Sequence, residues 1–239
     1  MMLFGGYDGT YKNDVWMLSL PASGTPAWTS FSPTGTPPSG RYVHAAIYDS
    51  ANQRMIVFGG WAGSYTNDAF ALSLPAGGNP AWTPLSPTGT PPSGRNGHTA
   101  IYDSTNQRMI VFGGTDGASR NDVFALSLPS SGSPAWTPLA PTGASPDTRY
   151  SHTAIFISAS ERMIVFGGNG VSNAVYALSL PVSGTPAWTQ LSPMGAWPVT
   201  RYSHTAVFDS ANERMAVFGG TDGAYKNDLW TLALPSCMP

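Results

Sequence analysis

The chain has 239 residues, of which 41% are hydrophobic and 10% charged, with a formal net charge of −2 and a pI of about 6.0. This length can bury a core as a single domain, and the weak charge offers no field for nucleic acid or an anionic membrane, so neither partner is expected. The 27 Gly and 22 Pro indicate turns rather than disorder, because 8 Trp, 10 Tyr and 10 Phe can fill an interior. Cys237 is the single cysteine, which excludes an intrachain disulfide and a cysteine metal cluster.

The sequence repeats at a nearly fixed interval. Phe-Gly-Gly recurs with steps of 54, 54, 54 and 52 residues, at Phe4, Phe58, Phe112, Phe166 and Phe218. Four Trp and four His keep this spacing, at Trp28, Trp82, Trp136, Trp188, His44, His98, His152 and His204. The repeats predict one domain over 1–239, with units at approximately 1–40, 41–94, 95–148, 149–200 and 201–239. The interval from Gly168 to Asn173 is two residues shorter than its counterparts, which predicts a surface loop there.

Taken in chain order, each unit reads as four short strands. The chain starts inside a second strand, since Met1 aligns with Met55, and it stops just after the third strand of the fifth unit. In the second complete unit, segments rich in β-branched and aromatic residues predict strands at 98–103, 108–114, 122–128 and 135–139, with a hairpin link at 104–107. Apolar residues alternate with polar or small ones, as at Phe124, Leu126 and Leu128, so the period is two and helices are not expected.

These motifs resemble the kelch repeat. They are Arg-x-x-His-x-Ala on the first strand, an apolar run ending in Gly-Gly on the second, Asn-Asp-Val-Phe on the third and Trp-x-x-Leu on the fourth. The resemblance covers essentially the whole chain. It implies an all-β fold, a β-propeller of about five units, in which four-stranded antiparallel blades surround a channel with their first strands innermost.

The ends of the chain leave closure open. The first and last units are incomplete, and about 29 residues are needed to complete five units at these steps. One alternative is a composite blade, in which strands from 201–220 join strands from 13–28 and close a ring of four. Others are a piece of a longer propeller and an engineered array. Unpaired edge strands would also favour self-assembly into a homo-oligomer.

Two groups of side chains are candidates for metal chemistry. The four His occupy one register near the start of the first strands, which favours structural hydrogen bonding within each blade over a metal or proton shuttle. Acidic loops such as Asp8–Asp14 and Asp116–Asp122 superficially resemble calcium loops, but they lack the alternating Asp ligands and the closing Glu. Neither a metal nor a cofactor is therefore expected.

The first strands are each preceded by an arginine and a second polar residue, and these should gather around one mouth of the channel. Guanidinium groups suit carboxylates and phosphates, and arginines at this place contact an acidic peptide in some kelch domains. The alternative is that each Arg brackets loop carbonyls or pairs with an Asp. The predicted ligand-binding residues are Arg41, Tyr42, Arg95, Asn96, Arg149, Tyr150, Arg201 and Tyr202.

The sequence therefore predicts a non-catalytic binding scaffold for a protein, an acidic peptide or a carbohydrate. No Gly-x-Ser-x-Gly nucleophile turn is present, and the lone Cys237 cannot supply the cysteine-linked tyrosine of kelch-like copper oxidases. A sugar-directed enzyme is the less favoured reading, and Asp147, Met194 and Trp197 are among the few departures from the repeat. No apolar run is long enough to span a bilayer and no leader peptide is recognisable; the low charge and Ser/Thr/Gly-rich loops favour a location outside the cytoplasm.

Overall fold

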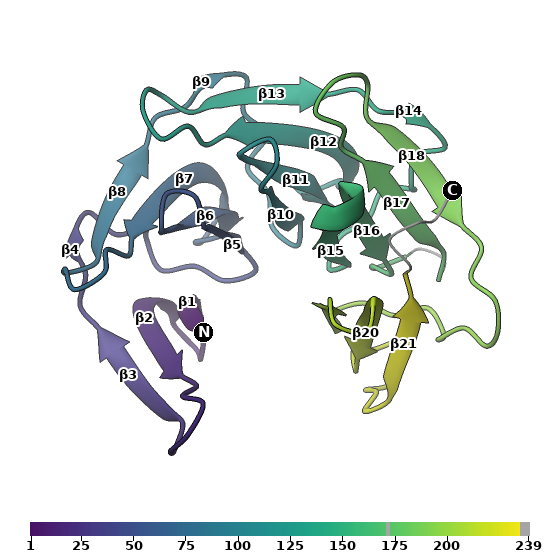
Figure 1. Ribbon diagram of the computed structural model, residues 1–239, viewed down its shortest axis with the longest axis horizontal. Helices are drawn as coiled ribbons and strands as arrows, with labels where there is room; N and C mark the ends of the chain where they lie inside the picture. Colours follow the sequence, from purple (N-terminus) through teal and green to yellow (C-terminus); the bar gives the residue numbers. More distant parts are fainter. Residues whose placement is uncertain (171–172, 235–239) are drawn as a thin grey trace.

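The computed structural model describes residues 1–170 and 173–234, and it consists of five separate β-sheets placed around a common centre (Figure 1). We number these sheets blade 1 to blade 5. Blade 1 contains β1 (Met2–Tyr7), β2 (Tyr11–Ser19) and β3 (Ala27–Phe31), and blade 5 contains β19 (Thr205–Asp209), β20 (Arg214–Phe218) and β21 (Leu229–Ala233). Cys237 and the middle of the 168–173 loop lie outside the described residues.

The three central blades each contain four antiparallel strands. Blade 2 has β5 (Ala45–Asp49), β6 (Arg54–Trp61), β7 (Tyr65–Ser73) and β8 (Ala81–Leu85). Blade 3 has β10 (Thr99–Asp103), β11 (Arg108–Thr115), β12 (Ser119–Ser127) and β13 (Ala135–Leu139). Blade 4 has β15 (Thr153–Ile157), β16 (Arg162–Phe166), β17 (Val175–Ser179) and β18 (Ala187–Leu191), with a 3₁₀ turn η1 (Ser158–Ser160) before β16.

The predicted strands and the all-β class are confirmed, and the differences lie at strand ends. In blade 3 the third strand begins at Ser119 rather than Asp122, because the second and third strands continue pairing up to Thr115 opposite Ser119. A bulge between Phe112 and Gly114 allows this extension. Gly113 has a φ of +65°, and a Cβ there would lie 2.8 Å from the carbonyl oxygen of Arg149, so a glycine is required at the bulge.

The hydrophobic core lies between neighbouring blades. The second strand of each central blade is buried on both faces, because a neighbouring blade packs against each face of its sheet. Its sequence is accordingly a continuous apolar run, such as Met109–Phe112. Phe112 packs its ring against Trp188 and His152 of the next blade, at centroid distances of 5.0 and 5.2 Å. Burial of each such large apolar side chain contributes about 1.5–3 kcal/mol.

Three very short strands were not predicted. They are β4 (Thr34–Gly35), β9 (Thr88–Gly89) and β14 (Thr142–Gly143), and each pairs in parallel with the outer strand of the following blade. They link neighbouring blades at the outer edge, for example through the Thr88 N–H, which donates to the Pro134 carbonyl at 3.0 Å. Each four-stranded blade thus gains a fifth strand from the loop that precedes it.

The described residues form an open arc, with blade 1 and blade 5 at its two ends (Figure 1). The composite blade considered from the sequence is wrong, because β19 and β20 pair with β21 while β2 and β3 pair with β1. Each end therefore keeps its own sheet. Phe218 of blade 5 and Trp28 of blade 1 are 53% and 50% exposed, whereas the equivalent Phe112 and Trp136 inside the array are buried.

Candidate functional site at the channel mouth

The residues predicted to gather at one mouth of the channel are brought together there by the backbone. Tyr42 and Trp61 exchange backbone hydrogen bonds of 3.2 and 2.9 Å, and the same bridge joins Asn96 to Thr115 and Tyr202 to Thr221. In blade 4 the Asn169 N–H donates to the Tyr150 carbonyl at 2.9 Å. The loop before each first strand is thereby tied to the loop between the second and third strands of its own blade.

A second set of backbone hydrogen bonds runs from blade to blade around this mouth. The N–H of Gly97 donates to the Val43 carbonyl, that of Ser151 to Gly97, and that of Ser203 to Ser151, at 2.7–3.1 Å. All four residues have φ between +53° and +62°. For the non-glycine residues this left-handed conformation is unfavourable, so the interblade hydrogen bonds hold the mouth in a shape that the local sequence does not prefer.

The four predicted arginines lie beneath this mouth. Arg41, Arg95, Arg149 and Arg201 have side chains that are at most 1% exposed. Arg95 Nη1 donates to the Gly113 carbonyl at 2.8 Å, and its guanidinium pairs with both carboxylate oxygens of Asp122 at 2.5 and 2.9 Å. Arg41 pairs with Asp68 and Arg201 with Asp228 in the same way. These guanidinium groups support the mouth from inside the blades, and a ligand on the surface does not reach them in this structure.

Arg149 differs from the other three arginines. Ala174 stands where the other pairs have Asp, and Nη2 of Arg149 has no hydrogen-bond partner among the described residues. The remaining bonds run from Nη1 to the Gly167 carbonyl and from Nε to the Asp147 carbonyl, at 2.9 and 3.1 Å. Burial lowers the pKa of Arg149, while Tyr176 and Asp147 oppose that shift. Asp147, a departure from the repeat, thus lies beside the one arginine of the set that has lost its aspartate.

The exposed part of the mouth is aromatic on the side of blades 1 and 2. We call Tyr7, Tyr11, Tyr42, Trp61 and Tyr65 the aromatic surface. The rings of Tyr11 and Tyr42 are stacked at 5.9 Å, Tyr7 lies 5.3 Å from Tyr42, and Trp61 meets Tyr65 edge-on at 4.8 Å. The indole N–H of Trp61 donates to the Tyr11 hydroxyl at 3.2 Å and so joins the two groups. Tyr7 and Tyr11 are 58% and 44% exposed.

Of these rings, only Tyr42 was predicted from the sequence as a binding residue. The others lie where the second strand ends and the third begins, at positions that vary between repeats: blade 3 has Thr115 and Ser119 there, and blade 5 has Thr221 but keeps a tyrosine at Tyr225. The signal that could have found them is this variation itself, because positions that differ between otherwise near-identical units are free of the packing that fixes the rest.

Two of the four histidines, His152 and His204, form hydrogen bonds between blades rather than within one, which corrects the expectation from the sequence for these two. The Nε2 atoms of His152 and His204 lie 2.9 and 2.8 Å from the hydroxyls of Thr99 and Thr153, each in the preceding blade. His98 has no such partner among the described residues, because Ala45 stands at the equivalent position. The blades are thus linked at their inner strands as well as at their outer edges.

We expect acid to destabilise the protein through these histidines. Burial, with the nearby Arg95 charge, lowers the pKa of His98 to about 3, and burial lowers the pKa values of His44 and His204 to about 4. Since each pKa lies below its value of about 6.5 in the unfolded chain, the unfolded state binds more protons, and the stability present above pH 6.5 is lost as the pH falls towards 4. The loss should be about 1–2 kcal/mol for each histidine by pH 5.

Urea unfolding between pH 4 and pH 8, followed by tryptophan fluorescence, measures this dependence. His98→Gln should show a shallower fall in stability with acid than the wild type, because one titrating group is gone. An identical pH profile for the two proteins would contradict the role given to His98.

The acidic loops use their carboxylates locally. The Asp8 carboxylate accepts hydrogen bonds from the Thr10 backbone and hydroxyl and pairs with Lys12 at 2.8 Å, and these contacts lower its pKa to about 2. Asp116 is held in the same way by Arg120. Over residues 1–170 and 173–234, no three His, Cys, Asp or Glu side chains lie close enough together to hold a metal ion.

A family model described as the KLHDC2/KLHL20/DRC7 Kelch-repeats domain matches residues 1–131. The chain belongs to the kelch-repeat family. Curated relatives include tip elongation aberrant protein 1 of Schizosaccharomyces pombe, 33% identical over 80% of this chain and 17% of that protein, and human host cell factor 2, 28% identical over 92% of this chain and 29% of that protein. The chain spans 17–36% of the length of five curated relatives that it matches.

Solved structures agree with the kelch propeller fold. The structure of YjhT aligns with a TM-score of 0.62 at 16% identity, covering 91% of this chain and 71% of that one. A fungal alcohol oxidase of the AA5 family in complex with copper aligns with a TM-score of 0.51 at 15% identity, covering 94% and 56%. At these identities the similarity concerns the fold alone. In the part of the chain that the structure describes, no helix has the length and apolar character needed to cross a membrane.

Proposed function

We propose that this kelch propeller is a non-catalytic scaffold that binds a protein or peptide on the aromatic surface at its mouth. Kelch-repeat propellers typically serve as scaffolds for protein interactions, which supports the general class. The single observation that carries the proposal is the joined cluster of five partly exposed rings, Tyr7, Tyr11, Tyr42, Trp61 and Tyr65. Tyr and Trp are the residues that most often dominate binding energy at protein interfaces.

The geometry of the aromatic surface favours binding because the rings are already held in place. Tyr11 is fixed by stacking on Tyr42 and by the hydrogen bond from Trp61, so little side-chain freedom is lost when a partner docks. Charge contributes less, since the guanidinium groups of Arg41, Arg95 and Arg201 already have aspartate partners. We therefore favour aromatic contact over recognition of an acidic peptide, and a carbohydrate remains the alternative ligand of such a surface.

A binding experiment can test this surface directly. Dodecapeptides selected from a random phage library on the wild-type protein should bind Tyr11→Ala and Tyr42→Ala at least tenfold more weakly, because each change removes an anchor ring. Tyr48→Ala removes an exposed ring on β5 outside the cluster and should leave binding unchanged. Unchanged binding in both mouth variants would contradict the proposal, and a steep loss of binding with added salt would favour the acidic-peptide alternative.

A second function, end-to-end assembly of copies, is favoured by the exposed faces of the terminal blades. Inside the array each Phe of a second strand packs on a Trp of the next blade, as Phe58 does on Trp136 at 4.9 Å. Phe218 and Trp28 occupy the equivalent positions at the two ends, and both are half exposed. Packing of Phe218 of one copy against Trp28 of another would repeat the internal contact, and such a head-to-tail interface forms a ring or a chain.

The molar mass in solution tests this second function. Light scattering coupled to size exclusion should give a multiple of 25.1 kDa for the wild type and about one chain for the double variant Trp28→Ser/Phe218→Ser. If the wild type is monomeric at about 100 μM, copies do not assemble through these faces with appreciable affinity, and the second function is contradicted.

A further inference from the structure

The buried arginine of blade 4 lacks the carboxylate that its counterparts have. In blade 3, Nη1 and Nη2 of Arg95 donate to the two carboxylate oxygens of Asp122 at 2.5 and 2.9 Å. Ala174 stands in place of that aspartate in blade 4, and Nη2 of Arg149 has no hydrogen-bond partner among the described residues. Arg149 is nevertheless fully buried. A buried guanidinium with an unused donor is unfavourable, so this nitrogen needs an acceptor from another source.

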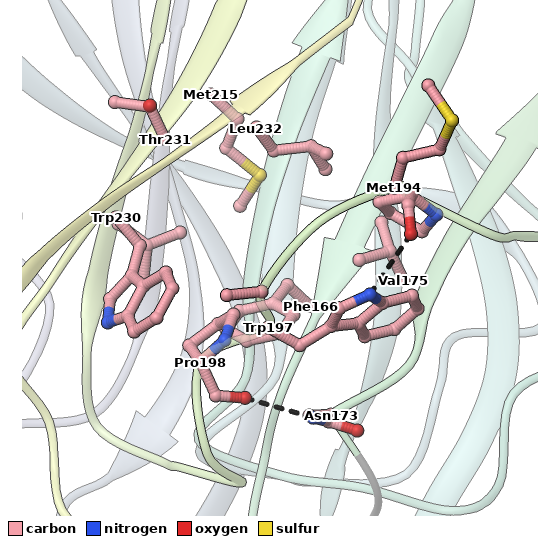
Figure 2. A pocket seen from close by; sticks show the side chains of 13 residues that line it. Phe166, Asn173, Val175, Met194, Trp197, Pro198, Met215, Trp230, Thr231 and Leu232 are labelled. Atoms are coloured by element: carbon pink, nitrogen blue, oxygen red, sulfur yellow. Dashed lines mark hydrogen bonds between the residues drawn. The ribbon is translucent and has the colours of Figure 1, made fainter.

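The backbone fixes the place of the missing carboxylate, although the loop before β17 is two residues shorter than its counterparts. Val175 pairs with Phe166 in the same register that β12 has with β11. The side chain of Asn173 donates to the Pro198 carbonyl at 2.9 Å (Figure 2), a bond that blades 2 and 3 also contain, at 3.3 and 3.0 Å. Ala174, between Asn173 and Val175, therefore occupies the backbone position that holds the aspartate in the other blades.

The guanidinium of Arg149 also keeps the orientation of its counterparts. Nη1 donates to the Gly167 carbonyl at 2.9 Å, and Nε donates to the Asp147 carbonyl at 3.1 Å. Arg95 forms the same two bonds in blade 3, at 2.8 and 3.2 Å. The ring of Tyr176 lies 5.2 Å from the guanidinium carbon and supports it from one side. The edge formed by Nη1 and Nη2 therefore faces the place that a carboxylate fills in blade 3.

That place is close to solvent. In blades 2, 3 and 5 the side chains of the aspartates are 40–44% exposed, while those of their arginine partners are at most 1% exposed. An anion from solution therefore has a short path to the guanidinium edge, and it must displace only the atoms that cover Nη2 in blade 4. Because this displacement opposes binding and a single ion pair near the surface is weak, we expect a dissociation constant in the millimolar range.

Asp147 is the competing acceptor within the chain. It replaces Ser93 of blade 3, whose hydroxyl accepts from Nη2 of Arg95 at 3.3 Å. Since a guanidinium nitrogen of this kind carries two N–H bonds, one points to the serine position and the other to the aspartate position. A carboxylate at position 147 can reach the first of these. The N–H that faces Ala174 stays available to a ligand.

We propose that blade 4 binds a small monovalent anion, a carboxylate of the size of formate, with its two oxygens on Nη1 and Nη2 of Arg149. Aspartate differs from alanine by one carboxylate group, so formate supplies the group that Ala174 lacks. Two parallel N–H···O bonds are the preferred pairing of guanidinium with carboxylate, and Arg95 and Asp122 already display this geometry. The site lies apart from the aromatic surface of blades 1 and 2 and does not rest on the proposed function.

Thermal unfolding of the full chain in sodium formate tests the site, with the ionic strength held constant by a bulky sulfonate. The Tm should rise by about 2–5 °C once formate exceeds its Kd about tenfold, because formate binds the folded state alone. Broadening of the ¹³C-formate NMR signal by the protein measures binding directly. An unchanged Tm and an unbroadened signal at about 200 mM formate would overturn the proposal.

Two alanine substitutions locate the binding. Ala174→Asp restores the ion pair of the other blades, so it should raise the Tm without formate and remove the response to formate. Ala22→Asp is the matched control, since it adds the same charge on an exposed loop of blade 1 and should keep the response. A response to formate that persists in Ala174→Asp would place the anion elsewhere and overturn the proposal.

Asp147→Ser separates the ligand from the acceptor within the chain. This variant restores the residue of blades 2 and 3 and should respond to formate at least as strongly as the wild type, because formate uses the other N–H of Nη2. A response that appears only in Asp147→Ser, and not in the wild type, would show that the Asp147 carboxylate already pairs with Arg149, and would overturn the proposal.

Discussion

Replacement of Arg95 by Met should lower the free energy of unfolding by about 3 kcal/mol. The guanidinium is fully buried and its bonds to Asp122, the Gly113 carbonyl and the Ser93 carbonyl and hydroxyl connect three segments of blade 3. Methionine keeps the packing against Phe124 but leaves the Gly113 carbonyl without its donor. The Asp122 side chain is 40% exposed, so water still hydrates its carboxylate in the variant. The loss of unfolding free energy therefore stays below the upper end of the range for breaking a buried ion pair.

Arg149→Met is the matched comparison, and it should cost only about 1 kcal/mol. Arg149 is buried as completely as Arg95, but it has no aspartate partner, and one of its terminal nitrogens is unpaired among the described residues. Its removal therefore relieves an uncompensated buried charge while it breaks the bond to the Gly167 carbonyl.

Urea unfolding at pH 7.5 on the two variants measures the difference, with tryptophan fluorescence as the signal. Equal losses for Arg95→Met and Arg149→Met would show that the aspartate contributes little, and that the bond to the glycine carbonyl dominates at both sites.

Gly89→Ala should lower the free energy of unfolding by about 2–3 kcal/mol. A Cβ at this position would lie 2.2 Å from the Trp136 carbonyl, an atom fixed by the pairing of β12 with β13, and the φ of +80° is itself unfavourable for alanine. Relief of the collision requires β9 to leave β13, with loss of the bond from the Thr88 N–H to the Pro134 carbonyl.

Gly195→Ala separates the collision from the backbone strain. Its φ of +89° is close to that of Gly89, but its Cβ would enter open space, so only the conformational penalty of about 1 kcal/mol is expected. Thermal unfolding of both variants beside the wild type tests the pair. A loss at Gly195 as large as that at Gly89 would mean that something already occupies the space beside β21 in solution.

Much of this fold was predictable because the same motifs recur in successive units, so that each unit supports the strand assignments of the others. The outer strand at Ala135–Leu139 was predicted to the residue, and the second strand at Arg108–Thr115 to within one residue, because their Trp-x-x-Leu and Phe-Gly-Gly signals lie inside the paired region. The start of β12 was missed, since Ser119 and Arg120 have no strong strand preference and pair only because a bulge in β11 extends the ladder.

The candidate site was harder to predict than the fold. The entry to each first strand follows from the repeat, and in the structure Tyr42 lies there, paired with Trp61. The sequence could not distinguish a guanidinium that faces the surface from one that faces inward, since that depends on which loop carbonyl and aspartate fold back over Arg41. Tyr7 and Tyr11 flank one variable turn and Trp61 and Tyr65 flank another, in the next blade, and only folding brings them to Tyr42.

The sequence by itself determined the kelch repeat and the four-stranded unit, because local alternation and turn residues specify these within about 54 residues of chain. The tertiary structure decided what lies between units. Histidine bonds across blades and the parallel contacts of β4, β9 and β14 arise from segments of different repeats. Their positions depend on the rotation from one blade to the next, a quantity that no local pattern encodes.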